Sequence, residues 1–241
     1  MRLGLLLCDR VRPGFRVVSG DYPEFVARLL PDQELVVYDL VAGQFPENLG
    51  ECDAWITSGS RQSVYEEIGW VMDFAHLVRR LHDEERKLVG VCFGAQMIAH
   101  ALGGVVGPAP NGWAVGIKTV VVPAPQPWMN PVASTFRILH SNADQIKSLP
   151  PGARVLGRAE EVPVSVLAVG DHILGLQGHP EFSSEYSAVL MESRRGNPIP
   201  DLVVEDGLAS LVEPPDTVLL ARWIENFILY NGALKFVSGV Q

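Results

Sequence analysis

Apolar and polar positions follow two alternating patterns along the first part of the chain. Short, continuous apolar runs of strand length alternate with segments whose apolar residues recur at helical spacing. The predicted strands are Leu3–Leu7, Glu34–Asp39, Ala54–Thr57 and Leu88–Val91, and the predicted helices are Glu24–Leu30, Trp70–Leu81 and the run from Phe93 to Leu102. Strands and helices in this order predict βαβ units and a mainly parallel sheet, and hence an α/β protein.

After about Gly112 the pattern changes to β-type runs. These are Val115–Val122, Phe136–Leu139, Val155–Gly157, Ser165–Val169 and His172–Leu176. Turn residues at 150–152 (PPG) and 170–171 (GD) separate several of them. We therefore expect hairpins and additional strands that return the chain to the sheet.

The last part of the chain combines a loop-rich segment with one amphipathic helix. Residues 196–216 are rich in proline, glycine and acids and predict a loop with a short helix, whereas Thr217–Tyr230 predicts the closing helix. No composition shift or repeat divides the sequence, so we expect residues 1–241 to form one domain. A length of 241 residues exceeds the usual domain size of about 100–200 residues, but single α/β domains often reach it.

Charge and apolar content argue against two classes of partner. A net charge of −9 argues against a nucleic-acid surface, which needs clustered Lys and Arg. The longest apolar runs, such as Leu3–Cys8, fall far short of the ~20 residues that cross a bilayer, and no signal-peptide cleavage site follows this one. The three cysteines, Cys8, Cys52 and Cys92, are odd in number and lack metal-ligand spacing. They predict a cytoplasmic protein with reduced thiols and no bound metal.

One cysteine has the sequence context of a nucleophile elbow. The run Leu88–Val91 leads through Cys92 directly into a helical pattern, with glycines at positions 90 and 94. A sharp strand-to-helix turn forces the nucleophile into an unfavourable backbone conformation, and flanking glycines relieve the crowding. The thiol would then lie at a helix N-terminus, where the partial positive charge favours the thiolate. Most lone cysteines are core residues, and the glycines are what favour a nucleophile here.

A thiolate nucleophile needs a partner that moves protons, and His179 fits this role best. It follows an apolar strand, where α/β folds place catalytic groups. Pro180 favours an extended His179, so that Glu181, two residues further on, faces the same side. A carboxylate there can hold the imidazole tautomer and stabilise the imidazolium. Alone, the tripeptide HPE (179–181) is a weak signal that is more typical of a surface turn; together with the elbow, it predicts a Cys92–His179–Glu181 triad.

Together the segments GVCFGAQ (90–96) and GHPEF (178–182) resemble the motifs of the class I, triad-type glutamine amidotransferases. The resemblance extends from the first predicted strand to the second motif. It implies a flavodoxin-like, three-layer α/β domain with helices on both faces of the sheet and the cysteine at its carboxyl edge. It also implies an enzyme that cleaves the γ-glutamyl amide of glutamine or of another γ-glutamyl compound through a γ-glutamyl thioester.

Other positions match the same family. The segment ITSGS (56–60) resembles the strand-ending SGGP loop, with serines in place of the first glycine and the proline. In the family, two backbone N–H groups form the oxyanion hole, and the resemblance places them at Gly59 and Phe93. Two such donors can stabilise a tetrahedral oxyanion without any side chain. Gln96 matches a family position near the bound glutamine, although an ordinary polar helix residue is the alternative.

More narrowly, the chain is similar to stand-alone members described as GMP-synthase-like or as γ-glutamyl-peptide hydrolases. The segments NGWAVG (111–116) and DQ (144–145) carry this similarity. The subgroup usually reads His-x-Asp-Gln, whereas this chain has Asn142 where the histidine is expected and His140 two residues upstream. The family's loop borders the glutamine site, so we expect Asn142 to contact the substrate and to influence substrate preference.

The sequence argues against two other classes of protein with a similar fold. In Cys-dependent peptidases and chaperones of similar fold, a histidine directly follows the nucleophile, but here Phe93 follows Cys92. A non-catalytic binding module would be expected to lack at least one triad residue, and all three are present.

The sequence leaves two alternatives for the group that accepts the γ-glutamyl moiety. About sixty residues follow Glu181, and neither a P-loop pattern nor a GxGxxG fingerprint after a strand is present, so we expect no cofactor. Either a separate synthase subunit receives the ammonia, or water is the acceptor and the enzyme is a γ-glutamyl hydrolase. We favour hydrolysis of a small-molecule substrate.

Overall fold

A seven-stranded sheet forms the centre of the computed structural model, which describes residues 1–230. Its strand order is β2-β1-β3-β4-β11-β10-β9, in which the first five are parallel and the last two run antiparallel to their neighbours. The strands are β1 (Arg2–Leu7), β2 (Glu34–Asp39), β3 (Ala54–Thr57), β4 (Leu88–Val91), β9 (Ala153–Gly157), β10 (Val166–Val169) and β11 (Ile173–Leu176). The predicted mainly parallel sheet is thereby confirmed.

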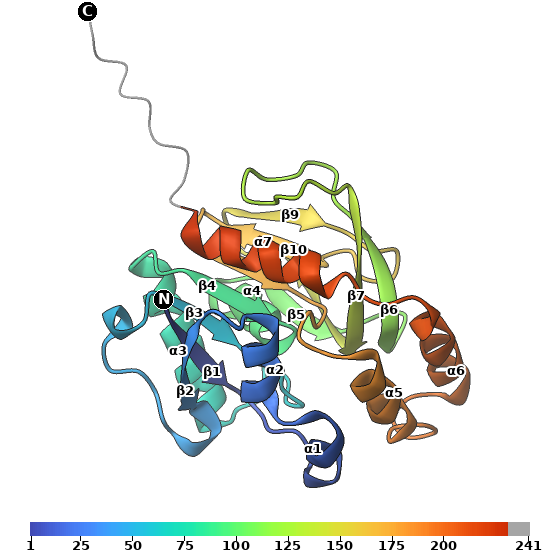
Figure 1. Cartoon of the computed structure of the whole chain (residues 1–241). Coiled ribbons are helices and arrows are strands. Elements are labelled where there is room, and N and C mark those ends of the chain that lie inside the picture. The colour runs from blue at the N-terminus through green and yellow to red at the C-terminus, as the bar shows by residue number, and fades with distance from the viewer. Residues whose placement is uncertain (231–241) are drawn as a thin grey trace, which may run out of the picture.

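Helices cover both faces of this sheet. On one face lie α2 (Tyr22–Leu29) and α7 (Thr217–Leu229), and on the other lie α3 (Gly69–Asp83) and α4 (Phe93–Ala101). Figure 1 shows α7 running along its face of the sheet. Alternate residues of β1 serve the two layers, since Leu5 packs with α2 and α7 while Leu6 packs with α3 and α4. The three-layer α/β architecture is therefore the one that the family resemblance implied.

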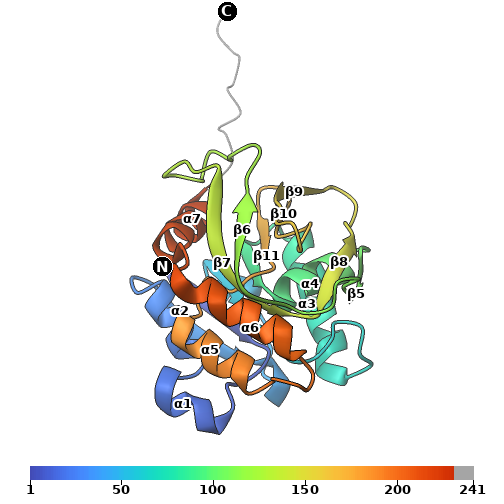
Figure 2. The same cartoon turned by 90° about the vertical axis from the view of Figure 1, so that its right-hand side faces the viewer.

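Two small sheets flank the central one. The strands β6 (Ala114–Val121) and β7 (Thr135–Asn142) pair with each other along their whole length, and β5 (Val105–Pro108) pairs with β8 (Asp144–Ser148). Figure 2 shows β6 and β7 as a separate ribbon beside the central sheet. The predicted hairpin pairing is therefore present in β6 and β7, but these two strands stay outside the central sheet instead of returning the chain to it. Their solvent-facing positions, such as Thr119, suit a ribbon with one exposed face rather than a central strand.

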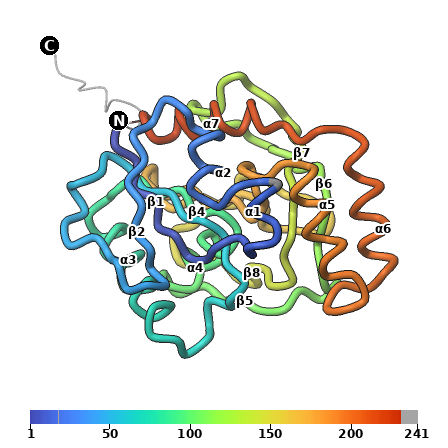
Figure 3. The backbone as a smooth tube through the Cα atoms, turned by 60° about the horizontal axis from the view of Figure 1, so that its bottom comes forward, coloured from blue at the N-terminus to red at the C-terminus, as the bar shows by residue number. Residues whose placement is uncertain are grey.

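Three short helices gather beyond the carboxyl ends of the parallel strands. They are α1 (Pro13–Ser19), α5 (Ser184–Glu192) and α6 (Asp201–Ala209), and α5 contacts both of the others. Figure 2 shows α5 beside α6 with α1 below them, and Figure 3 shows α1 next to α5. The helix α6 is the short helix expected within 196–216, and α7 is the expected closing helix. Three 3₁₀ turns, at Leu40–Ala42, Leu49–Glu51 and Ser210–Val212, complete the described elements.

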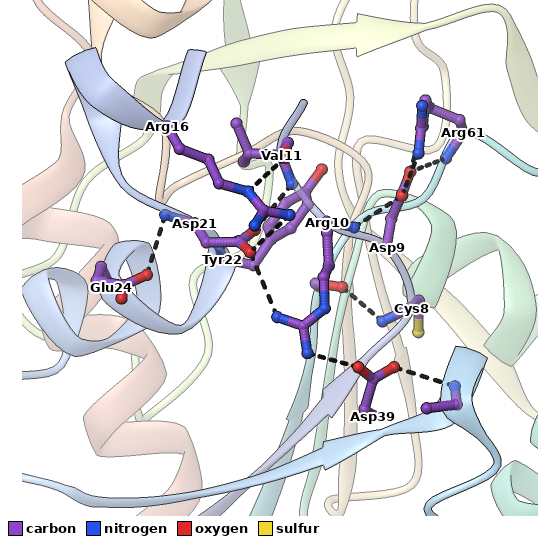
Figure 4. Close-up of polar contacts among 12 residues, drawn as sticks. Cys8, Asp9, Arg10, Val11, Arg16, Asp21, Tyr22, Glu24, Asp39 and Arg61 are labelled. Carbon is purple, nitrogen blue, oxygen red and sulfur yellow. Dashed lines mark hydrogen bonds and ion pairs between the residues drawn. The ribbon is translucent and has the colours of Figure 1, made fainter. Parts of the chain in front are cut away.

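The segment between β1 and α2 is fixed by charged side chains. Asp21 caps α2 by accepting a hydrogen bond from Tyr22 N, and it also accepts one from Val11 N. Arg10 bridges Asp21 and Asp39, as Figure 4 shows. These contacts hold the loop that follows β1 against the start of α2.

Within residues 1–230, no helix is both long and apolar enough to cross a membrane.

Candidate active site

Cys92 occupies a strained turn between β4 and α4. Its backbone has φ 50° and ψ −101°, a region that residues with a side chain rarely adopt. A Cβ added to Gly94 would lie 1.8 Å from Thr57 Oγ1, and one added to Gly90 would lie 2.7 Å from the Gly94 carbonyl oxygen. Only glycine fits at these two positions. The elbow predicted from the spacing of glycine, cysteine and glycine is therefore present.

His179 lies beside Cys92 because β11 and β4 are neighbours in the sheet. Both strands run in the same direction, so the residues that follow them meet at the same carboxyl edge. The Nδ1 atom of His179 is 2.8 Å from Glu181 Oε1. The imidazole also stacks on Phe182, with ring centroids 3.9 Å apart and planes 8° from parallel. The hydrogen bond to Glu181 thus fixes one edge of the imidazole, and the stacking on Phe182 fixes the orientation of its plane.

The charges around His179 favour the imidazolium. Burial lowers the pKa of His179, but the charges of Glu181 and Cys92 outweigh it and raise the pKa to about 10. Glu181 Oε2 is buried and has no hydrogen-bond partner among residues 1–230, so Oε1 carries the one hydrogen bond of this carboxylate, to His179. An imidazolium next to the Cys92 sulfur can give its proton to a departing amine.

The loop that follows β3 brings Gly59 against the imidazole. A Cβ on Gly59 would lie 2.8 Å from His179 Cε1, so a glycine is needed for this close approach. Among residues 1–230, neither the Gly59 N–H nor the Phe93 N–H donates a hydrogen bond to another group. Gly59 thus lies against the His179 imidazole and Phe93 directly follows Cys92, and their role as the two donors of an oxyanion hole stays a prediction.

Side chains fix this loop at three points. Thr57 Oγ1 accepts a hydrogen bond from Val91 N at 2.9 Å, which joins the loop to the residue before the cysteine. The hydroxyl of Ser58, which replaces a family glycine, accepts from Cys8 N at 2.8 Å and donates to the Gly59 carbonyl. Further along, Arg61 forms a two-pronged ion pair with Asp9, drawn in Figure 4.

Gln96 and Asn142 converge on one backbone group. Both side-chain amides donate to the carbonyl oxygen of Asp144, at 2.8 and 3.0 Å. Asn142 Oδ1 lies 3.1 Å from His140 Nδ1, and burial lowers the pKa of His140 to about 4. His140 is therefore neutral at neutral pH and is bonded to Asn142. The expected substrate contacts of Gln96 and Asn142 stay predictions, although both line a cleft.

Gln177 is a site residue that the sequence analysis missed. It is buried, its Nε2 donates to Cys92 Sγ at 3.7 Å, and its Oε1 accepts from Gln96 Nε2 at 3.2 Å. It follows β11 directly, two residues before His179. In an extended segment, residues two apart face the same side, and this spacing relates Gln177 to His179 as it relates His179 to Glu181. The same pattern could therefore have predicted that Gln177 faces Cys92.

The cleft lined by Gln96 and Asn142 has a volume of about 430 Å³. It lies next to the triad, since Gln96 contacts Gln177 and Gln177 contacts the Cys92 sulfur. Its charged lining residues are Arg12, Arg61, Asp144 and Arg194. Such a volume is typical of a site for a small molecule.

Comparisons with known proteins agree with this geometry. The family model of glutamine amidotransferase class-I matches residues 36–192, which is more than half of the chain. A glutamine amidotransferase from Thermotoga maritima has the same fold, with a TM-score of 0.72 at 20% identity over 95% of this chain and 99% of that one. The chain belongs to the class I glutamine amidotransferase family and is an enzyme of that family.

Its curated relatives differ in how much of their length is matched. Gamma-glutamyl peptidase 5 of Arabidopsis thaliana is 28% identical over 70% of this chain and 71% of its own length. Gamma-glutamyl peptidase 4 of the same plant is 30% identical over 69% of this chain and 70% of its own length. The GMP synthase of Thermomicrobium roseum is 33% identical over 68% of this chain, but the match covers only 30% of that enzyme.

Proposed function

We propose that this enzyme hydrolyses the γ-glutamyl amide bond of γ-glutamyl peptides, with Cys92 as nucleophile, His179 as acid–base and Glu181 as the residue that orients it. The observation that carries the proposal is the strained Cys92 beside a hydrogen-bonded pair, in which His179 Nδ1 lies 2.8 Å from Glu181 Oε1. Support for a peptide as substrate comes from the relatives named gamma-glutamyl peptidase, which match this chain over most of both lengths.

In the proposed reaction, Cys92 Sγ attacks the γ-carbonyl carbon and the Gly59 and Phe93 N–H groups bind the resulting oxyanion. The C–N bond then breaks as the His179 imidazolium gives its proton to the departing amine, which leaves a γ-glutamyl thioester. Water attacks the thioester carbonyl while His179 takes up its proton. The C–S bond breaks, glutamate leaves, and the Cys92 thiolate and the His179 imidazolium are restored. Gln177 donates to the sulfur and keeps it aimed at the carbonyl.

The experiment that tests this proposal uses the purified chain alone. Incubation with a γ-glutamyl dipeptide should release glutamate and the second amino acid in equal amounts, at a rate at least as high as release of ammonia from glutamine. Cys92→Ser should abolish both, since a hydroxyl is a much weaker nucleophile at neutral pH. If Cys92→Ser and wild type release glutamate equally, the proposal is wrong.

The similarity to GMP synthases supports a second candidate, supply of ammonia to a separate synthase subunit. A subunit of that kind would be inactive on all γ-glutamyl compounds until its partner binds. Activity that is absent from the pure chain and appears only in a cell extract would favour this second function over hydrolysis.

A further inference from the structure

Two neighbouring arginines at the end of α5 have opposite environments. Arg195 faces the surface, where it pairs with Glu192 and Glu205. Arg194 points into the cleft instead, where Nη1 donates to Ser141 Oγ at 2.9 Å and the guanidinium carbon lies 5.5 Å above the ring of Trp113. Burial lowers the pKa of Arg194, but a guanidinium stays protonated in proteins, so the side chain brings a full charge into the cleft.

The cleft as a whole has unbalanced cations. It is lined by three arginines, of which Arg61 is paired with Asp9. Within residues 1–230, Arg12 and Arg194 form no ion pair with any carboxylate. The one carboxylate in the lining, Asp144, accepts hydrogen bonds from the hydroxyls of Ser63 and Tyr65, and no cation of the described residues lies within ion-pair distance of it. Counting residues 1–230, the cleft thus presents two arginines without a carboxylate partner and one carboxylate without a cationic partner.

This charge pattern matches one substrate class better than the other. Glutamine carries one carboxylate and one ammonium group, whereas a γ-glutamyl amino acid or peptide carries two carboxylates and one ammonium group. A half-buried guanidinium gains most from a carboxylate, which it can bind through two parallel hydrogen bonds. The second carboxylate of a γ-glutamyl peptide can therefore pair with an arginine of the cleft that has no other carboxylate partner.

The position of the two arginines in the sequence indicates which part of the substrate they contact. The family model covers residues 36–192, and both Arg12 and Arg194 lie outside it. The γ-glutamyl half of the substrate is common to the family, whereas the departing amine differs from member to member. Groups outside the shared region are suited to the departing half. The charge of Arg194 is nevertheless close enough to Cys92 for the two to interact.

From these observations, and resting on the proposed function, we propose that Arg194 binds the carboxylate of the departing amino acid or peptide and so selects γ-glutamyl peptides over glutamine. Ser141 and Trp113 hold the guanidinium in place for this contact. Arg194 is then a specificity determinant for the departing half of the substrate, separate from the residues that carry out bond cleavage.

The test compares γ-glutamylalanine with its C-terminal carboxamide, which differ only in the second carboxylate. Wild type should cleave the free acid with a kcat/KM about 10- to 100-fold higher, the range for a hydrogen bond between charged groups. Arg194→Met, which keeps the apolar stem on Trp113, should remove this preference and leave the carboxamide rate within about threefold. Arg194→Lys should retain part of it, and the surface control Arg195→Met all of it.

Equal loss on both compounds in Arg194→Met would overturn the inference, as would equal cleavage of both compounds by wild type. The second comparison needs no variant, so it decides the matter even if Arg194→Met fails to fold. If wild type cleaves neither compound, the proposed function fails, and the inference is tested separately by calorimetric binding to Cys92→Ala. Tighter binding of the free acid than of the carboxamide would then support the role of Arg194, and equal binding would refute it.

Discussion

Replacing Gly59 with alanine tests whether the loop after β3 supports catalysis through its close approach to the imidazole. The new methyl group would lie 2.8 Å from His179 Cε1, whereas ordinary van der Waals contact begins at 3.4 Å, so the two must separate by 0.6 Å. Neither side yields easily. His179 is held by Glu181 and by the stacked Phe182, and the loop is tied down on both sides of Gly59.

A displacement of this size exceeds the tolerance of about 0.5 Å within which catalytic groups must be held. Moving one oxyanion donor out of place should cost about 10²-fold in kcat, near the lower end of the effect of deleting such a donor. KM should change little, because Gly59 is expected to act on the oxyanion rather than on the bound substrate.

Steady-state cleavage of a γ-glutamyl dipeptide, followed as released glutamate, measures this effect. The matched control is Gly69→Ala at the start of α3, where a Cβ meets nothing within 4 Å, and it should keep full activity. Melting curves should show both variants folded. A Gly59→Ala enzyme with the kcat of wild type would refute the assignment of an oxyanion donor to this loop.

Four further predictions concern the same site. His179→Ala should lose at least ~10²-fold in kcat, and Glu181→Gln should lose less because the base remains; an unchanged His179→Ala enzyme would mean that another histidine acts. Gln177→Met removes the donor to the Cys92 sulfur and should reduce kcat up to about tenfold without unfolding the protein, which thermal melting checks. Arg61→Ala removes the two side-chain hydrogen bonds to Asp9 but keeps the one from the Arg61 backbone N–H, so it should lower kcat for glutamate release while thermal melting shows little change in stability. The folded-state pKa of His179 is raised to about 10, so its stabilising effect is complete below pH ~6.5 and is lost as pH rises towards 10; urea titrations should show this loss in wild type and not in His179→Gln.

The central layer of the fold could be predicted because its strands are buried on both faces. Continuous apolar runs such as Ala54–Thr57 and Leu88–Val91 agree with the structure to the residue. The strand β8 was missed because its sequence, DQIKS, is mostly polar, and β5 because it is short and ends in proline. The helix α5 was missed because its apolar residues lack clear helical spacing.

The candidate site divides in the same way. Cys92 and the HPE segment could be found because each is a local motif next to a strand end. The cationic cleft could not, because Arg12 and Arg194 are distant in sequence and meet only through the contact of α1 with α5. That residues 1–241 form one domain, and that the protein is cytoplasmic, stay predictions.

The most direct test of the central claim is covalent labelling by a glutamine analogue with a diazo-ketone in place of the amide. Such a compound alkylates the nucleophile that attacks the γ-position, and peptide mass spectrometry identifies the modified residue. All three cysteines are buried, so exposure alone does not favour one of them. We predict a single adduct on Cys92 and loss of activity in step with its formation. An adduct on Cys8 or Cys52, with Cys92 unmodified, would contradict the account.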